Sequence, residues 1–175
     1  MHVFRRPLQL AALALFLSQG TLAQNYRADI TVDIEGLEKK LVALAEAIPE
    51  DKYSWSPQKG VRSVSQALMH TASANFFFPS LVGVPIPEGI NPRELEQITT
   101  KDEVVRTLKD SFEQLKKMVT ASADRELDEM VNMPGRQTTL AGALHAAVSH
   151  SHEHLGQMIA YARSVGTVPP WSEGN

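Results

Sequence analysis

The sequence predicts an all-α fold in which four helices form a bundle. Four segments carry apolar residues at the i, i+3, i+4 and i+7 spacing that makes one side of a helix apolar. Capping patterns, prolines or glycines stand at the ends of these segments. The connection between the first two segments, residues 49–62, has no strand pattern, and the chain shows no internal repeat. These observations favour a single helical domain.

Residues 1–23 have the pattern of a cleaved export signal. A short basic start, Met1–Arg6, precedes the apolar run Leu8–Phe16, and Thr21 and Ala23 supply the small residues of a cleavage site. The apolar run is too short to span a bilayer. We therefore expect a protein that is periplasmic or secreted, with no membrane anchor left after cleavage.

The mature domain, residues 24–175, is long enough to bury a core of its own. Removing 23 of the 175 residues leaves 152, with 15 basic and 20 acidic residues and a formal charge of −5, because Arg5 and Arg6 are lost from the 17 basic ones. This charge argues against nucleic acid or an anionic membrane as partner. The chain has no cysteine, which excludes disulfides, thiolate ligands and a cysteine nucleophile.

The first helix is expected from about Arg27 to Ile48, where Pro49 ends it. Its apolar positions are Ile30, Ile34, Leu37, Leu41, Leu44, Ala45 and Ile48. The second helix begins with a capping box in which Ser63 and Gln66 satisfy each other's free backbone N–H groups. It continues to about Phe78, and Pro79 should end or kink it.

The third helix is expected to open with a second capping box, Thr100–Glu103, and to reach about Ala123. The segment before it, residues 83–99, contains prolines and glycines and is long for a bundle connection. The fourth helix begins near Thr138 or Thr139, after a loop that contains Pro134-Gly135. It runs to Val165, where Gly166 suits the position just after a helix.

Three histidines form the candidate functional site. His150 and His154 are one turn apart in the fourth helix and therefore share a face. His70 lies in the second helix. Two ligands from one helix and one from another would make a three-histidine site with an open coordination position, which is the catalytic pattern for zinc-like metals.

Spacing alone leaves this assignment open. On a helical wheel, His145 and His152 line the opposite flank of the fourth helix, so only one of the two pairs can face His70. We choose His150 and His154 and expect the other two at the surface. A single inward histidine such as His70 is more often a hydrogen-bonded core residue than a ligand.

Other chemistries lack their motifs. No His-Glu-x-x-His metalloprotease motif, paired Glu-x-x-His units, Gly-x-Ser-x-Gly, P-loop or dinucleotide fingerprint is present. Glu153 falls on the outer face of its helix, where a solvated charge is expected, and the acids of segment 94–96 are expected to be loop or helix-end charges with no catalytic spacing. No catalytic residue is assigned. Asn75, Gln157 and Tyr161 are the nearest polar candidates to support the histidines.

Two ordered motifs carry a resemblance to a known family. The C-terminal one is His150-x-x-x-His154-x-Gly156-Gln157-x-x-x-Tyr161-x-Arg163-x-x-Gly166-x-x-Pro169-Pro170. The other is Ser63-Val-x-x-x-Leu68-x-His70, which follows the loop Trp55-Ser-Pro57. Both resemble the signatures of the DinB-like superfamily, and the resemblance covers essentially the whole mature chain.

The resemblance implies a four-helix bundle of up-down-down-up topology, with a long crossover between the second and third helices that residues 83–99 would form. It also implies a divalent metal ion, zinc or nickel, held by His70, His150 and His154. Relatives include thiol-dependent transferases and isomerases, in which the metal lowers the pKa of a bound thiol.

The chain departs from these relatives in two ways. Leu155 stands where they often have arginine, and the export signal would send the protein away from the cytosolic thiol pool. We therefore expect a metal-dependent transferase or hydrolase acting on a small molecule, or alternatively a non-catalytic module that binds metal or a small ligand. A third alternative is a bundle whose histidines hold no metal. The sequence decides neither the metal nor the substrate, and it leaves a homodimer open.

Overall fold

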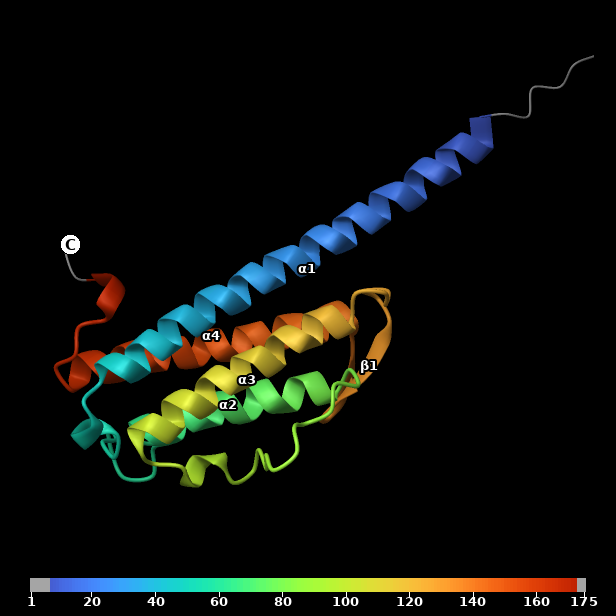
Figure 1. Cartoon of the computed structure of the whole chain (residues 1–175). Coiled ribbons are helices and arrows are strands. Elements are labelled where there is room, and N and C mark those ends of the chain that lie inside the picture. The colour runs from blue at the N-terminus through green and yellow to red at the C-terminus, as the bar shows by residue number, and fades with distance from the viewer. Residues whose placement is uncertain (1–6, 173–175) are drawn as a thin grey trace, which may run out of the picture.

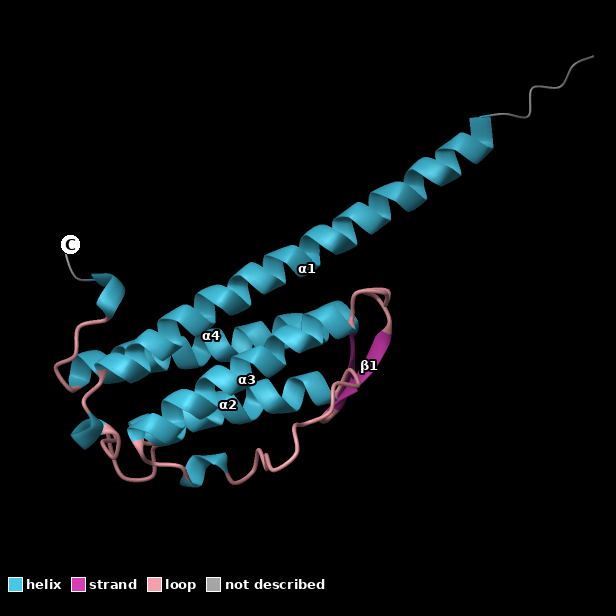
Figure 2. Cartoon of the chain, in the orientation of Figure 1, coloured by secondary structure: helices cyan, strands magenta, loops and turns pink. Residues whose placement is uncertain are grey.

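Four helices and one short hairpin make up the fold. A computed structural model describes the backbone of residues 7–172 and the side chains of residues 23–172. The helices are α1 (Pro7–Ala47), α2 (Val64–Ser80), α3 (Lys101–Ala121) and α4 (Leu140–Ser164), and the strands are β1 (Met130–Met133) and β2 (Arg136–Thr139). Three single turns of 3-10 helix lie at Glu50–Lys52, Leu95–Gln97 and Pro170–Ser172. The predicted all-α bundle is confirmed (Figure 2).

The helices have the up-down-down-up arrangement that the resemblance implied. In Figure 1, α2 and α3 run in the same direction, and α1 and α4 both run in the opposite one. Each of α1 and α2 packs against both α3 and α4, so α1 and α2 lie diagonally across the bundle. Two parallel neighbours such as α2 and α3 need a connection that returns along the bundle. Residues 81–100 make that crossover (Figure 1).

The core forms where the helical periodicity places it. All seven apolar positions predicted for the first helix are buried, as are Leu144, Leu155, Met158 and Ala162 in α4. The crossover is tied to the bundle at both ends. The Ser73 hydroxyl donates to the carbonyl of Pro92 (2.7 Å), and the Gln114 amide donates to that of Pro85 (2.7 Å).

The helix ends follow local chemistry, with one exception. Ser63 and Gln66 form the predicted capping box, and the Thr139 hydroxyl caps α4 by accepting from the amide of Gly142. The box predicted at Thr100 is wrong. Its hydroxyl donates to the Glu103 carboxylate instead of accepting from the backbone, because the two exposed side chains satisfy each other directly.

Helix α1 is longer than predicted. It begins at Pro7 rather than near Arg27. The residues between these two positions contain no proline and a single glycine, Gly20, so little in this segment opposes a helix. The basic start of the predicted export signal, Met1–Arg6, lies outside the described residues. Export and cleavage after Ala23 therefore stay predictions. Over the described part of the chain, no helix is both long and apolar enough to cross a membrane.

The hairpin between α3 and α4 had not been predicted. Met133 pairs with Arg136 across Pro134-Gly135, and Gly135 has a φ of +76°, which glycine tolerates in the third position of a tight turn. Val131 is the strand residue buried against the core. The strands have no clean apolar–polar alternation, so the Pro-Gly pair was the sole local signal for a turn.

Candidate metal centre

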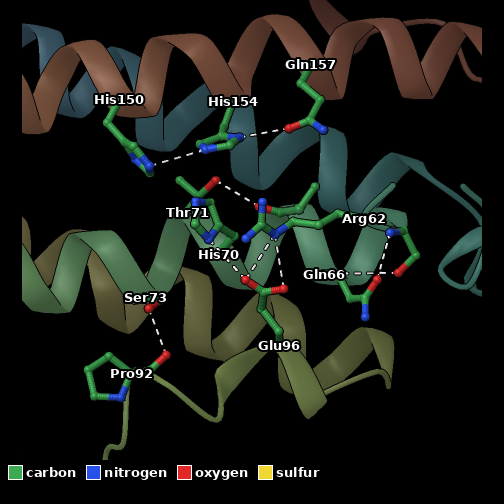
Figure 3. A network of polar contacts seen from close by, with 12 residues as sticks. Arg62, Gln66, His70, Thr71, Ser73, Pro92, Glu96, His150, His154 and Gln157 are labelled. Atoms are coloured by element: carbon green, nitrogen blue, oxygen red, sulfur yellow. Dashed lines mark hydrogen bonds and ion pairs between the residues drawn. The ribbon is translucent and has the colours of Figure 1, made fainter. Parts of the chain in front are cut away.

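The predicted histidines come together at the interface of two helices. His70 lies on α2, and His150 and His154 lie on the flank of α4 that faces it (Figure 3). One ring nitrogen from each residue lies within 4.8 Å of the other two. This convergence follows from the packing of α2 against α4, which brings residues about 80 positions apart to one place. These three histidines can hold one metal ion.

The spacing of the two ring nitrogens on α4 agrees with a shared tetrahedral zinc ion. The Nε2 atoms of His150 and His154 are 3.3 Å apart. Two nitrogens bound to one zinc ion at about 2.0–2.1 Å and at the tetrahedral angle would be about 3.3–3.4 Å apart. The His70 ring centroid lies 4.9 Å from that of His154 and 5.3 Å from that of His150. No large movement of α4 is therefore needed to seat an ion between its two rings.

The rings of His70 and His154 are each held by a hydrogen bond from Nδ1, the nitrogen that points away from the shared centre. Nδ1–H of His70 donates to the Glu96 carboxylate (3.0 Å), and Nδ1–H of His154 donates to the Gln157 carbonyl oxygen (2.8 Å). A proton on Nδ1 leaves Nε2 with the lone pair that a metal needs. Nδ1 of His150 is buried and has no hydrogen-bond partner among the described residues.

A chain of hydrogen bonds surrounds the histidines. The Gln157 amide donates to the Tyr161 hydroxyl (2.9 Å), and that hydroxyl donates to the backbone carbonyl of Arg62 (3.1 Å). The side chain of Arg62 then donates through Nε to both oxygens of Glu96, at 3.0 and 3.1 Å. The supports of His154 and His70 are thus joined through one residue, Arg62, which directly precedes the cap of α2 (Figure 3).

The environment keeps the imidazoles of His70 and His150 neutral. Burial, together with the neighbouring His154, His70 and Arg62, lowers the pKa of His150 to about 4. Burial also lowers the pKa of His70, with Arg62 and His154 adding to the effect and the bond to Glu96 opposing it. Metal binding requires the neutral form of the ring. His70 and His150 are therefore in the form that can bind a cation at neutral pH.

Burial and charge act in opposite directions on Glu96. Burial raises its pKa, but the hydrogen bond and charge of Arg62, together with the hydrogen bond from His70, outweigh burial and hold the pKa below its usual value. Glu96 is therefore an ionised carboxylate at neutral pH. A carboxylate on the outer nitrogen of a metal-binding histidine fixes the ring and makes it a stronger ligand.

Aromatic side chains flank the site while one side stays accessible. The Phe78 ring lies 5.9 Å from that of His150, and Trp55 packs edge-on against Tyr161 at 5.3 Å. The side chains of His70 and Glu96 are 29% and 35% exposed. The site is therefore in contact with solvent on the side of the crossover.

Comparison with known proteins agrees with this architecture. A family model described as the DinB superfamily matches residues 33–158, which is more than half of the chain. The chain belongs to the DinB superfamily. The resemblance noted from the motifs is thereby confirmed.

Individual relatives of this DinB-superfamily chain are distant in sequence. It is 24% identical over 124 residues to the uncharacterized protein YjoA of Bacillus subtilis (strain 168), an alignment that covers 70% of this chain and 80% of YjoA. The crystal structure of YjoA, described as DinB-like, superimposes with a TM-score of 0.64 and covers 80% of this chain and 93% of its own. A DinB-like protein from Bacillus cereus ATCC 10987 gives a TM-score of 0.65 at 17% identity, covering 84% and 95%. At these identities the structures establish the fold.

Of the other polar residues considered from the sequence, some support the site and some lie away from it. His145 and His152 are exposed, as expected from the opposite flank of α4. Gln157 and Tyr161 support the site, but Asn75 makes no hydrogen bond to the histidines among the described residues. Its amide lies in the core, where it donates to the Ser111 hydroxyl and accepts from that of Ser151.

Glu96 and Arg62 are the site residues that sequence reasoning missed. Glu96 lies in a loop turn, as expected, but the crossover also brings its carboxylate to His70, 26 positions away in the sequence, which no spacing indicated. Leu95, its neighbour, is buried in the core and anchors this turn. Neither residue has a spacing motif that would have identified it.

Proposed function

We propose that this protein is exported, periplasmic or secreted, and uses a divalent metal ion, zinc or nickel, in the transfer or hydrolysis of a small molecule. His70, His150 and His154 would hold the ion and leave a fourth coordination position for the small molecule. The observation that supports this most directly is the approach of the three ring nitrogens to within 4.8 Å of one another. The basic, apolar and small-residue pattern of residues 1–23 supports export.

The ion would supply Lewis-acid chemistry, lowering the pKa of a bound water or thiol. The protein's own residues do the positioning. Glu96 and Gln157 hold the rings of His70 and His154 with their Nε2 atoms inward, and Tyr161 and Arg62 hold those two supports in turn. This arrangement restricts ring rotation, so that less ordering is needed when a ligand binds.

One observation favours the alternative of a binding module without turnover. Glu96 is the described carboxylate that contacts the histidines, and it already accepts hydrogen bonds from both Arg62 and His70. A general base must be able to take a proton from the reacting group. A bound water or a group on the substrate would have to take that role in an enzyme.

Metal analysis of single-alanine variants tests the site. We expect His70→Ala, His150→Ala and His154→Ala each to lower zinc affinity sharply, while His145→Ala and His152→Ala leave it nearly unchanged. The measurement is competition with a chromogenic chelator, together with elemental analysis of protein purified from its native compartment. Equal losses for all five variants would mean surface chelation and would overturn the proposal.

Turnover separates an enzyme from a binding module. The metal-loaded protein is assayed with small thiols and electrophilic acceptors, and separately with esters and amides. Activity that His154→Ala abolishes would establish the enzyme. Saturable ligand binding without such activity would establish the module.

N-terminal sequencing of the exported fraction tests cleavage after Ala23, and a mature protein that still begins at Met1 would refute it.

A further inference from the structure

Arg62 lies at the edge of the histidine cluster, and its guanidinium has N–H groups that make no hydrogen bond among the described residues. Among the described residues, its side chain makes hydrogen bonds only through Nε, and both go to Glu96. A guanidinium has four further N–H groups on its two terminal nitrogens. The side chain is 43% exposed, so it is in contact with solvent. In Figure 3 the guanidinium lies between the helix that carries His154 and the turn that carries Glu96.

The residue is held in place at both ends. Its backbone carbonyl accepts from the Tyr161 hydroxyl at 3.1 Å, and its Nε is fixed by the two oxygens of Glu96. A side chain fixed in this way loses little conformational entropy when it binds a further group. A solvated surface arginine that serves only as an ion-pair partner needs no such double attachment.

The local charge favours an anion once a metal is bound. Imidazole ligands are neutral and leave both charges of a divalent ion uncompensated. The ion pair between Arg62 and Glu96 adds no net charge to this balance. A cation beside a fork of guanidinium donors matches a ligand in which a metal-binding atom and an oxyanion lie a few bonds apart.

We infer that Arg62 selects the small molecule by binding a carboxylate or phosphate group of it through the free edge of its guanidinium, beside the fourth coordination position of the metal. The inference rests on the proposed metal site and narrows its substrate class to anionic small molecules. Glu96 then has two positioning roles, because one carboxylate orients both the His70 ring and the Arg62 fork.

A matched pair of probe ligands tests the inference. The protein is loaded with Co²⁺, whose bond to a thiolate gives an intense near-ultraviolet absorption band. It is then titrated with 3-mercaptopropionate and with 2-mercaptoethanol, which differ in whether a carboxylate follows the metal-binding sulfur. A charge-assisted contact to Arg62 should make the acid bind roughly ten- to a hundredfold more tightly.

Three variants locate the cause of this preference. Arg62→Gln should bring the two thiols to equal affinity, and Arg62→Lys should retain part of the preference, because lysine keeps the charge without the fork. Arg93→Gln is the matched control, since Arg93 is an exposed arginine of the crossover and the change in charge is identical. It should keep the full preference. Competition by acetate and by inorganic phosphate then shows which oxyanion the site prefers.

The failures are distinguishable. Equal binding of the two thiols to the unmodified protein, or a preference that survives in Arg62→Gln, would overturn the role of Arg62 while the metal site stands. Failure of Co²⁺ to bind, or binding that does not depend on His70, His150 and His154, would overturn the proposed function and this inference with it. Because the first comparison uses the unmodified protein, poor folding of a variant does not prevent a decision.

Discussion

Replacing Glu96 by glutamine should weaken metal binding about tenfold without unfolding the protein. The carboxylate accepts from Nδ1 of His70 at 3.0 Å, and removing its charge makes the ring a poorer ligand. Hydrogen-bonding partners of ligating histidines contribute about ten- to a hundredfold to metal affinity. Glu96 is 35% exposed, so solvent screens part of its charge. We therefore expect the lower end of this range, roughly 1.4 kcal/mol.

The assay is zinc affinity at neutral pH, measured by chelator competition, with urea unfolding of the metal-free protein alongside. Glutamine keeps a carbonyl oxygen that can accept from His70, and a partly exposed ion pair contributes under about 1 kcal/mol, so stability should change little. Glu94→Gln is the control, because it removes the same charge from an exposed residue two positions away. Unchanged zinc affinity in Glu96→Gln, or an equal loss in Glu94→Gln, would refute the supporting role.

Two further predictions concern stability. The metal-free protein should become less stable as the pH falls from about 6.5 to about 4, because the pKa of His150 is lower in the folded state and the unfolded chain binds more protons in that window. Urea titrations at several pH values measure this effect. A dependence of stability on pH that is no flatter in His150→Gln would contradict it. Phe112→Ala should lower the free energy of unfolding by about 3–5 kcal/mol, since Phe112 is fully buried in the core. The urea midpoint should fall with little change in the slope of the transition. A loss under about 1 kcal/mol would mean that the core closes over the cavity.

Much of the fold follows from local patterns. The first helix has its buried face where the apolar spacing places it, from Ile30 to Ile48. Helix α2 begins at the predicted Ser63 box, and Gly166 has the positive φ (83°) expected just after a helix. These features depend on residues within one or two turns of each other, which is the range over which spacing and capping act.

The candidate site was predictable only in part. The i, i+4 spacing placed His150 and His154 on one face, but whether that face or the opposite one meets His70 depends on how α4 is rotated against α2. Packing decides that rotation, by burying Leu155 and Met158 and leaving His152 exposed. The hairpin escaped prediction for a related reason, since Val131 is its anchor in a core that the rest of the chain builds.

By itself, the sequence determined the helices, their apolar faces, the absence of cysteine chemistry and the three histidines that could share an ion. The tertiary structure decided that the His150 flank faces His70, and it brought Glu96, from the crossover, and Arg62, from the loop before α2, to the site without any local signature. The physical reason is one of range. Helix formation and capping depend on neighbours within a few residues, whereas the contacts that Glu96 and Arg62 make at the site join segments 26 to 99 residues apart and exist only once the core has packed.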